Sequence, residues 1–184
     1  MRITGGEYSG RRLATSAAMH ARPTQDRVRE ALFSMLAPRL AGCAFLDLFA
    51  GTGAAGLEAL SRGAADVNWV ENSPAMFKVL LKNLAMLAVP SDTARRQDVF
   101  SFLRRCAANS FDVVFADPPY AQRGGADHVQ KLLENEFLPR ILRSDGVLVI
   151  EQGAREALRA PAGWRLQDNR KYGQSRILFY INGA

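Results

Sequence analysis

The sequence predicts an α/β protein built on a seven-stranded, mostly parallel sheet with helices on both faces. Three observations support this fold class. Short apolar runs alternate with segments of helical periodicity between residues 44 and 151. A glycine-rich turn joins the first apolar run to the first helical segment. Two further strand-like runs close the chain with no helix between them, which adds one antiparallel strand.

The central segment contains five candidate strands and four candidate helices. The strands are expected at Ala44–Phe49, Asp66–Glu71, Thr93–Gln97, Phe111–Ala116 and Val147–Glu151. The helices are expected at Ala54–Arg62, Pro74–Leu87, Phe100–Ala107 and Ala126–Leu142. Strand–helix alternation of this kind predicts right-handed βαβ units and therefore a parallel sheet covered on both faces.

The last 21 residues depart from this alternation. Trp164–Asn169 and Ser175–Ile181 both read as strands, and the short turn KYGQ separates them. If the first of the pair runs parallel to the other strands, the turn lies at the carboxyl edge of the sheet. Ligands of open α/β sheets bind at that edge.

Residues 1–40 are predicted to form an extension to a core of residues 41–184, within a single domain of 184 residues. The stretch ITGGEYSGRRLA suggests a small hairpin in which Gly5, Gly6 and Gly10 supply turn conformations. The stretch RPTQDRVREALFSML suggests a helix with Thr24 as its N-cap.

The charge is distributed unevenly along the chain. Residues 1–39 carry a net charge of +4 and residues 155–184 also carry +4, whereas residues 40–154 carry −2. Two basic ends around a slightly acidic core suit a polyanionic partner such as nucleic acid. A solvated, solubilising surface explains the same charges equally well.

Other features of the composition bear on the compartment. Cys43 and Cys106 stand far apart with no CxxC spacing, and the chain has two histidines. This pattern argues against a disulfide framework or a zinc site, and it fits a reducing cytoplasm. The N-terminus lacks the apolar segment of a secretory signal, and no apolar run is long enough to cross a bilayer.

The first glycine-rich turn indicates a nucleotide site. DLFAGTGAAG places Gly51, Gly53 and Gly56 between a strand and a helix, where backbone N–H groups are free to meet a ligand. Glu71 ends the next strand, and a carboxylate at that position can accept hydrogen bonds from both hydroxyls of a ribose. The combination favours an adenosine-type ligand over a purely structural turn.

Two more acids narrow the choice of ligand. Asp47 lies in the first strand and could help to hold a cationic amine, and Asp98 follows the third strand, where it could accept from an adenine amino group. Acids at the ends of successive strands suit the cationic S-adenosylmethionine better than the pyrophosphate of a dinucleotide. Each acid could instead cap a helix, which for Asp98 alone is the commoner role.

The fourth strand ends abruptly in Asp117-Pro118-Pro119-Tyr120. The two prolines cannot extend the sheet and fix the backbone. The Asp117 carboxylate and the Pro118 carbonyl could then accept both hydrogens of one exocyclic amine, with Tyr120 stacked on the base. This arrangement would support direct methyl transfer without a covalent enzyme intermediate. The alternative is a strand that ends in a structural proline turn.

Together these segments resemble class I methyltransferases with a Rossmann-like fold, and more specifically the RsmD family. The resemblance runs through RITGG, GRRL, RPTQDRVREALF, DLFAGTGAAGLEALSRGA, ADPPY and KYGQS, and so covers nearly the whole chain. It implies transfer of a methyl group from S-adenosylmethionine to the N2 amine of one guanine, at position 966 of 16S rRNA. The implied partner is the small ribosomal subunit or an assembly intermediate, and the protein is expected to be a monomer.

The resemblance also implies roles for individual residues. The catalytic set is Asp117, Pro118, Pro119 and Tyr120. The cofactor-binding set is Asp47, Phe49, Gly51, Thr52, Gly53, Glu71, Asn72, Asp98 and Val99. The RNA-binding set is Arg2, Arg11, Arg12, Arg22, Thr24, Arg27, Arg29, Lys171 and Tyr172, with no metal expected.

Two alternatives remain open at this point. The same tetrapeptide occurs in enzymes that methylate DNA adenine or a protein glutamine. The lack of room for a target-recognition domain weighs against DNA, and Asp rather than Asn at position 117 weighs against glutamine. A non-enzymatic RNA-binding protein with an adenosine-binding fold is the second alternative, and failure to bind S-adenosylmethionine would favour it.

Overall fold

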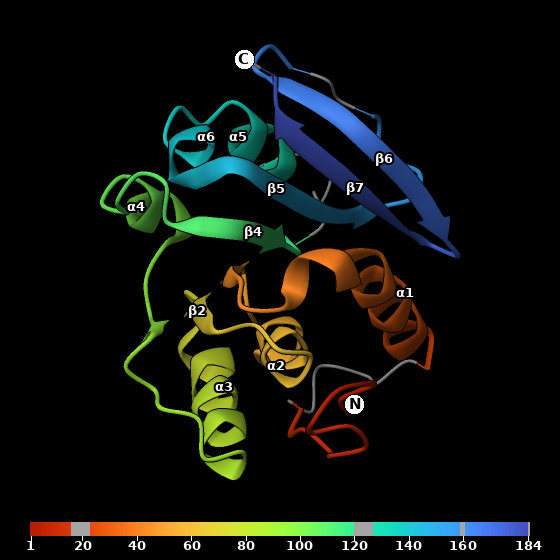
Figure 1. Ribbon diagram of the computed structural model, residues 1–184, viewed down its shortest axis with the longest axis vertical. Coiled ribbons are helices and arrows are strands. Elements are labelled where there is room, and N and C mark those ends of the chain that lie inside the picture. The colour runs from red at the N-terminus through yellow and green to blue at the C-terminus, as the bar shows by residue number, and fades with distance from the viewer. Residues whose placement is uncertain (16–22, 120–126, 159–160, 184) are drawn as a thin grey trace.

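The computed structural model describes residues 1–15, 23–119, 127–158 and 161–183. These residues form one seven-stranded sheet with helices packed against it (Figure 1). The strand order is β3-β2-β1-β4-β5-β7-β6, which confirms the predicted fold class. None of the described helices is both long enough and apolar enough to cross a bilayer.

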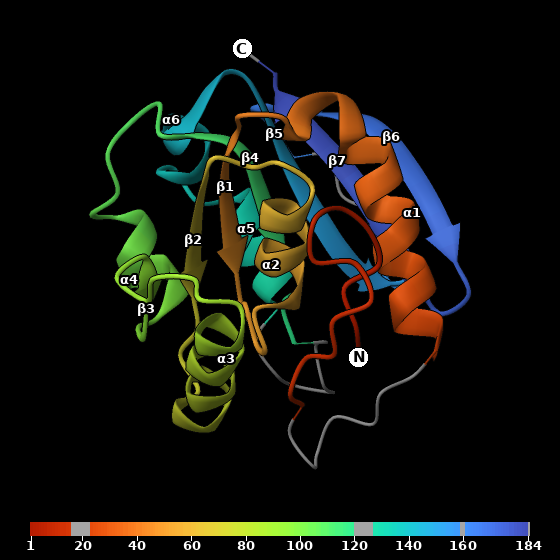
Figure 2. The same ribbon diagram turned by 60° about the horizontal axis from the view of Figure 1, so that its bottom comes forward.

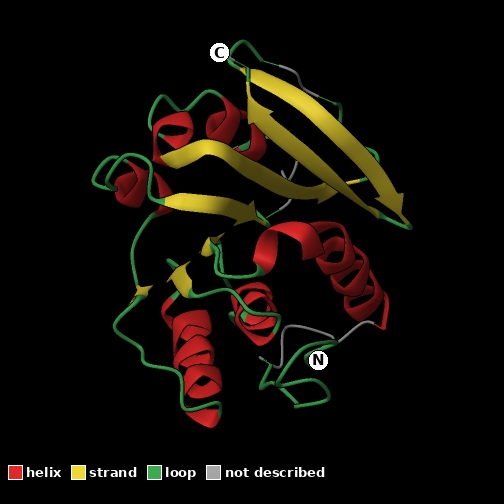
Figure 3. Ribbon diagram, in the orientation of Figure 1, coloured by secondary structure: helices red, strands yellow, loops and turns green. Residues whose placement is uncertain are grey.

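The elements follow the predicted alternation (Figure 3). The strands are β1 Ala44–Leu48, β2 Asp66–Val70, β3 Ala94–Arg95, β4 Phe111–Ala116, β5 Leu142–Gly153, β6 Trp164–Tyr172 and β7 Ser175–Asn182. The helices are α1 Pro23–Leu40, α2 Ala54–Ser61, α3 Pro74–Met86, α4 Val99–Leu103, α5 His128–Leu133 and α6 Leu138–Ile141.

The sheet is parallel from β3 to β5 and changes direction at β7. Strand β7 pairs antiparallel with both β5 and β6, so β6 runs parallel to the others. Because Gly153 pairs with Ser175, the β6–β7 turn lies beside the carboxyl end of β5. The expectation that the final hairpin turns at the carboxyl edge is therefore confirmed.

Alternate residues of the buried strands point to opposite faces of the sheet. Phe45 and Val113 pack in one apolar cluster with side chains of α1, α2 and α3, whereas Leu46 and Val114 pack in a second cluster with α4, α5 and α6. Figure 2 shows α2 and the N-terminal loop in front of the strands, with α5 behind them. Both faces are thus covered, as a parallel sheet requires.

The structure differs from the predicted elements in the segment before β5. The helix expected at Ala126–Leu142 is two short helices, because the Asn135 side chain accepts hydrogen bonds from the backbone N–H groups of Phe137 and Leu138 and starts a new helix. Strand β5 begins at Leu142 rather than Val147, and its pairing with β4 is irregular near Phe111. An Asp-Gly pair inside the strand resembles a turn, and for this reason the predicted start of the strand is too late in the sequence.

Smaller differences occur elsewhere. The third strand has two residues, Ala94–Arg95, instead of the predicted five. Helix α1 begins at Pro23, so Thr24 lies inside it and the predicted N-cap position is wrong. The helix also continues beyond the predicted segment to Leu40, with Pro38 tolerated near its end.

The N-terminal segment is a compact loop, closed by one antiparallel bridge between Arg2 and Arg12. Gly6 has a φ of 79°, and a Cβ there would lie 1.8 Å from the carbonyl oxygen of Ser61. The next residue, Glu7, donates its backbone N–H to that same oxygen at 2.7 Å. The absence of a side chain at Gly6 therefore lets the loop rest directly on the end of α2.

Glu58 of α2 is the buried anchor of this loop. Its carboxylate has no exposed surface and accepts from the backbone N–H and the hydroxyl of Thr4 at 2.8 and 2.7 Å. It also pairs with Arg62 at 2.8 Å and with Arg29 of α1 at 3.3 Å. One side chain thus joins the N-terminal loop, α1 and α2.

We expect Glu58→Gln to lower the free energy of unfolding by about 3 kcal/mol, because it leaves the buried Arg29 guanidinium without its anionic partner on α2. Denaturant titration measures this change. Glu30→Gln, an exposed substitution on α1, should stay within about 0.5 kcal/mol of wild type. Equal stability of the two variants would contradict the anchoring role.

Candidate active site

An open cavity of about 680 Å³, which includes space open to solvent, lies at the carboxyl edge of the sheet. The N-terminal loop, α1, the loop after β1 and the ends of β4 and β5 all contribute to its walls. The lining residues are Met1, Arg29, Leu32, Asp47, Phe49, Ala50, Gly51, Thr52, Ala54, Ala55, Phe115, Asp117 and Glu151. The cavity therefore lies where the sequence places the glycine turn and the acid at the end of the fourth strand.

The glycines of the turn have different roles. Gly51 lines the cavity with a φ of 57°. A Cβ at Gly53 would lie 2.2 Å from Leu80 of α3, and a Cβ at Gly56 would lie 2.1 Å from the Trp69 indole of β2. Gly51 thus allows a close approach from the cavity, whereas the other two allow the helices to pack tightly on the sheet.

Phe49 also adopts a left-handed backbone conformation, with a φ of 57°. Such a φ is unusual for a bulky residue and marks a backbone held by its surroundings. Phe49 lines the cavity, and its ring lies 5.5 Å from the ring of His128. The sharp turn after β1 therefore sets an aromatic side chain against the start of α5, next to the candidate site.

Asp47 is almost fully buried beneath the turn. Its Oδ2 accepts the Gly56 backbone N–H at 2.9 Å. Burial raises the pKa of Asp47 from 3.8 to about 8; the Gly56 hydrogen bond opposes this shift and the Glu71 charge adds to it. In the ligand-free protein this carboxyl is a weakly acidic group that a nearby cation would help to ionise.

Glu71 organises the turn from the neighbouring strand. One carboxylate oxygen accepts the Gly51 N–H at 2.7 Å, and the other accepts the Ser73 N–H at 2.6 Å. Each oxygen has a further lone pair that could meet a ribose hydroxyl. Glu71, the residue predicted to bind the ribose, thus also fixes the loop that would contact the rest of the nucleotide.

Of the remaining cofactor positions, Asp98, Asn72 and Val99 lie outside the cavity lining, whereas Thr52 lies within it. Asp98 is the N-cap of α4 and accepts from Ser101 N–H at 2.9 Å, which is the structural role weighed against adenine binding. Asn72 is exposed and Val99 is buried. Thr52 is buried in the lining, and its carbonyl accepts from the Asn83 side chain at 2.9 Å.

Asp117 and Glu151 bring two more carboxyls to the cavity. Asp117 is solvent-exposed, although many protein atoms surround its carboxyl and desolvate it. This desolvation, followed by the charges of Glu151 and Asp47, raises the pKa of Asp117 well above 3.8. Burial likewise raises the pKa of Glu151, and the Ser175 hydroxyl and Arg29 lower it. Three acids on β1, β4 and β5 therefore share one cavity.

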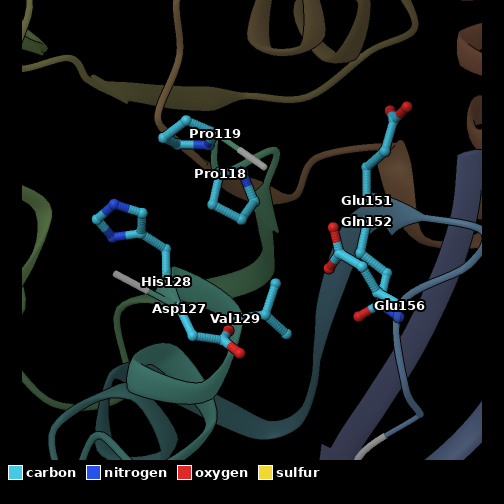
Figure 4. Close-up of a pocket in the computed structure, with 8 residues that line it drawn as sticks. All are labelled: Pro118, Pro119, Asp127, His128, Val129, Glu151, Gln152 and Glu156. Carbon is cyan, nitrogen blue, oxygen red and sulfur yellow. The ribbon is translucent and has the colours of Figure 1, made fainter. Parts of the chain in front are cut away.

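A smaller pocket of about 210 Å³, again counting open space, adjoins the proline turn. Figure 4 shows Pro118 and Pro119 beside His128, with Glu151, Gln152 and Glu156 across the pocket. Asp127 and Val129 complete the lining. The backbone after β4 thus lies between the large cavity and a second hollow with polar walls.

The expected RNA-facing residues divide into three groups. Arg2, Arg11, Arg12, Arg27 and Lys171 are exposed. Arg29 is instead buried, bound to Asp26 and Glu58 and to the carbonyl of Arg2, and Tyr172 is half-buried with its hydroxyl 3.7 Å from the Met35 sulfur. Arg22 and the side chain of Thr24 lie outside the described part of the chain, as does Tyr120 of the expected catalytic set.

The sequence patterns did not mark Met1 or Glu151 as site residues, and they placed Arg29 among the RNA-binding residues rather than in the cavity. Glu151 sits near the end of a parallel strand, so the rule that drew attention to Glu71 and Asp117 could have found it. No comparable pattern marks Met1, because its place depends on how the N-terminal loop folds back toward Thr52.

Comparisons with known proteins extend over the whole chain. The family model described as Conserved hypothetical protein 95 matches residues 1–181. The Ribosomal RNA small subunit methyltransferase D of Escherichia coli strain K12 is 37% identical, over 100% of this chain and 91% of that protein. The protein of the same name from Haemophilus influenzae is 34% identical, over 99% and 94%.

A solved structure gives the same result. The Escherichia coli protein yhhF, provisionally described as a methyltransferase, is 36% identical to this chain and superimposes with a TM-score of 0.79. The match covers 99% of this chain and 97% of that one. The likeness therefore includes the N-terminal loop and the final hairpin as well as the sheet.

Asp47 makes the stability of the ligand-free protein depend on pH. The pKa of Asp47 is raised from 3.8 to about 8 in the folded state, so the folded state binds a proton at this carboxyl more tightly than the unfolded state does. The free energy of unfolding should therefore fall as pH rises from about 4 to 8. We expect Asp47→Asn to flatten this dependence. At pH 8.5 the variant should gain at least about 1 kcal/mol, or a Tm rise of about 2–4 °C.

Calorimetry across this pH range measures the effect, with the exposed Asp92→Asn as the matched control. Parallel stability curves for wild type and Asp47→Asn would show that this carboxyl is not held protonated.

Proposed function

The chain belongs to the RsmD family of methyltransferases, and we propose that it methylates the N2 amine of one guanine in 16S rRNA, with S-adenosylmethionine as donor. The implied target is position 966. The observation that carries the proposal is the cluster of Asp47, Asp117 and Glu151 beside a glycine turn in one cavity. The charges of Glu151 and Asp47 raise the pKa of Asp117, and crowded carboxyls of this kind favour a ligand that brings positive charge.

The residues fit the donor. When bound, S-adenosylmethionine supplies a methyl group on a positively charged sulfur. Gly51 leaves room for the methionine part to approach the backbone, and Asp47 offers an acceptor to its ammonium group. Glu71 would accept from the ribose hydroxyls, and Asp98 with Val99 and Asn72 would bound the adenine. Phe49, Thr52 and Gly53 shape the turn itself.

The target amine would be held at the end of β4. The Asp117 carboxylate and the Pro118 carbonyl would accept its two hydrogens, which leaves the nitrogen lone pair free to face the methyl carbon. The rigid prolines keep these acceptors in place, and Tyr120 would stack on the base. Asp117 would also accept the proton that the nitrogen loses as the N–C bond forms and the C–S electron pair returns to sulfur.

The N-terminal extension, residues 1–40, would hold the RNA. Its exposed arginines lie on a loop that Glu58 anchors to α2 and that Asn83 anchors to the glycine turn. Asn83 binds both the backbone of Ala14, at 2.7 and 3.1 Å, and the carbonyl of Thr52 at 2.9 Å. We infer a single functional domain in which the same anchoring residues hold the RNA site and the cofactor site. We also infer that the protein is a monomer that acts in the cytoplasm on small subunits or their precursors.

The assigned role of Asp117 predicts a separation of binding from chemistry. Asp117→Ala should lower the rate of methyl transfer to small subunits at least 100-fold, because the amine loses its charged acceptor. The affinity for S-adenosylmethionine, measured by calorimetry, should change less than tenfold. The exposed Asp92→Ala should match wild type in both assays. Loss of cofactor binding in Asp117→Ala would sink the assigned role.

The exposed arginines predict a salt-dependent contribution to RNA binding. Replacing Arg11 and Arg12 by Gln should weaken binding to small subunits and reduce the slope of log affinity against log salt by about 0.7–0.9 for each lost phosphate contact. The affinity for S-adenosylmethionine should not change. Arg104→Gln with Arg105→Gln, an exposed pair after α4, is the matched control. An unaltered slope would mean that Arg11 and Arg12 are merely solvated.

A further inference from the structure

We propose that Glu151 is the specificity-determining residue that selects guanine, by accepting a hydrogen bond from the N1–H that lies next to the N2 amine. The inference rests on the proposed function, because it names a second acceptor for the same base. It concerns a residue that neither the tetrapeptide nor the glycine turn contains.

The position of Glu151 is the first argument. Ala116 pairs with Ile150 in the parallel ladder between β4 and β5. The next residues, Asp117 just after β4 and Glu151 near the end of β5, therefore lie side by side at the carboxyl edge of the sheet. Both side chains line the large cavity. Two acceptors on adjacent strands can meet two neighbouring donors on one ligand.

The second argument is that Glu151 joins the two hollows. Among the residues that the structure describes, it alone lines both the large cavity and the small pocket beside Pro118 and Pro119. In Figure 4 its side chain extends away from those of Gln152 and Glu156. A base that enters between the proline turn and the donor would pass this carboxyl.

The third argument is that the carboxyl is held in place. The Ser175 hydroxyl on β7 binds it, and the Arg29 guanidinium favours its charged form. Arg29 is itself fixed by Asp26 and Glu58, at 3.0 and 3.3 Å. Gln152, the next residue, is also buried, and its Nε2 is bound to the Ala157 carbonyl. Glu151 therefore presents an acceptor with little freedom to reorient.

The donor pattern of the base completes the argument. Guanine presents N1–H and the N2 amine as adjacent donors, which match the carboxylates of Glu151 and Asp117. 2-Aminopurine carries the same amine beside an N1 that is an acceptor, and adenine and cytosine also pair their amines with ring acceptors. A carboxylate that faces such a nitrogen is left unpaired, and sites of this kind reject the wrong ligand strongly.

The test compares guanine with 2-aminopurine at the methylated position, in 16S rRNA ligated from synthetic and transcribed pieces and assembled into small subunits. Wild type should methylate guanine at least 100-fold faster than 2-aminopurine. Glu151→Gln should reduce this ratio at least tenfold, because the amide can donate to N1. The fluorescence of 2-aminopurine gives a separate binding readout, and the variant should bind the analogue more tightly than wild type does.

Two variants serve as controls. Glu156→Gln makes the same chemical change at a residue that lines the small pocket alone, and Glu136→Gln makes it at an exposed position. Both should keep the wild-type ratio. Calorimetry with S-adenosylmethionine should show that Glu151→Gln still binds the donor.

The outcomes separate the two proposals. An unchanged ratio in Glu151→Gln, a changed ratio in Glu156→Gln instead, or loss of donor binding in Glu151→Gln would each overturn the role of Glu151 and leave the proposed function standing. A wild-type protein that methylates no guanine in the assembled subunit would overturn the proposed function itself.

Discussion

Asp47, Asp117 and Glu151 lie in or just after three neighbouring strands and line one cavity, and the crowding of their carboxyls is the constraint on which the site depends. A parallel sheet brings the carboxyl ends of its strands to one edge, so acids at these ends must share the same space. Desolvation raises the pKa of each acid, and the charges of Glu151 and Asp47 raise the pKa of Asp117 further. A ligand that adds positive charge and hydrogen-bond donors would stabilise the charged forms of these carboxyls.

The same site depends on supports from distant parts of the sequence. Glu58 ties the N-terminal loop to α1 and α2, and Asn83 ties the segment after that loop to the glycine turn. Through Glu58, Arg29 is held beside the cavity, where its charge favours ionised Glu151. The basic extension is therefore structurally continuous with the cavity rather than a separate appendage.

Sequence patterns anticipated the central fold well, because buried strands and helices follow regular periods. They failed where single side chains redirect the backbone, as Asn135 does before α6, and where a turn-like pair lies within β5. In the site, Asp47 and Asp117 were predicted from their places in and after strands, and Gly51 from its place in the glycine turn. Glu151 and the burial of Arg29 were not, because they depend on how β5, α1 and Glu58 meet in space.

Mapping the methylated nucleotides of small-subunit rRNA tests the central claim most directly. Subunits from cells that lack this protein would be incubated with it and labelled S-adenosylmethionine, then digested and analysed by mass spectrometry. The account predicts one new methyl group, on the N2 amine of a single guanine at position 966. Label in another nucleotide class, in ribosomal protein, or in no component of the subunit would contradict it.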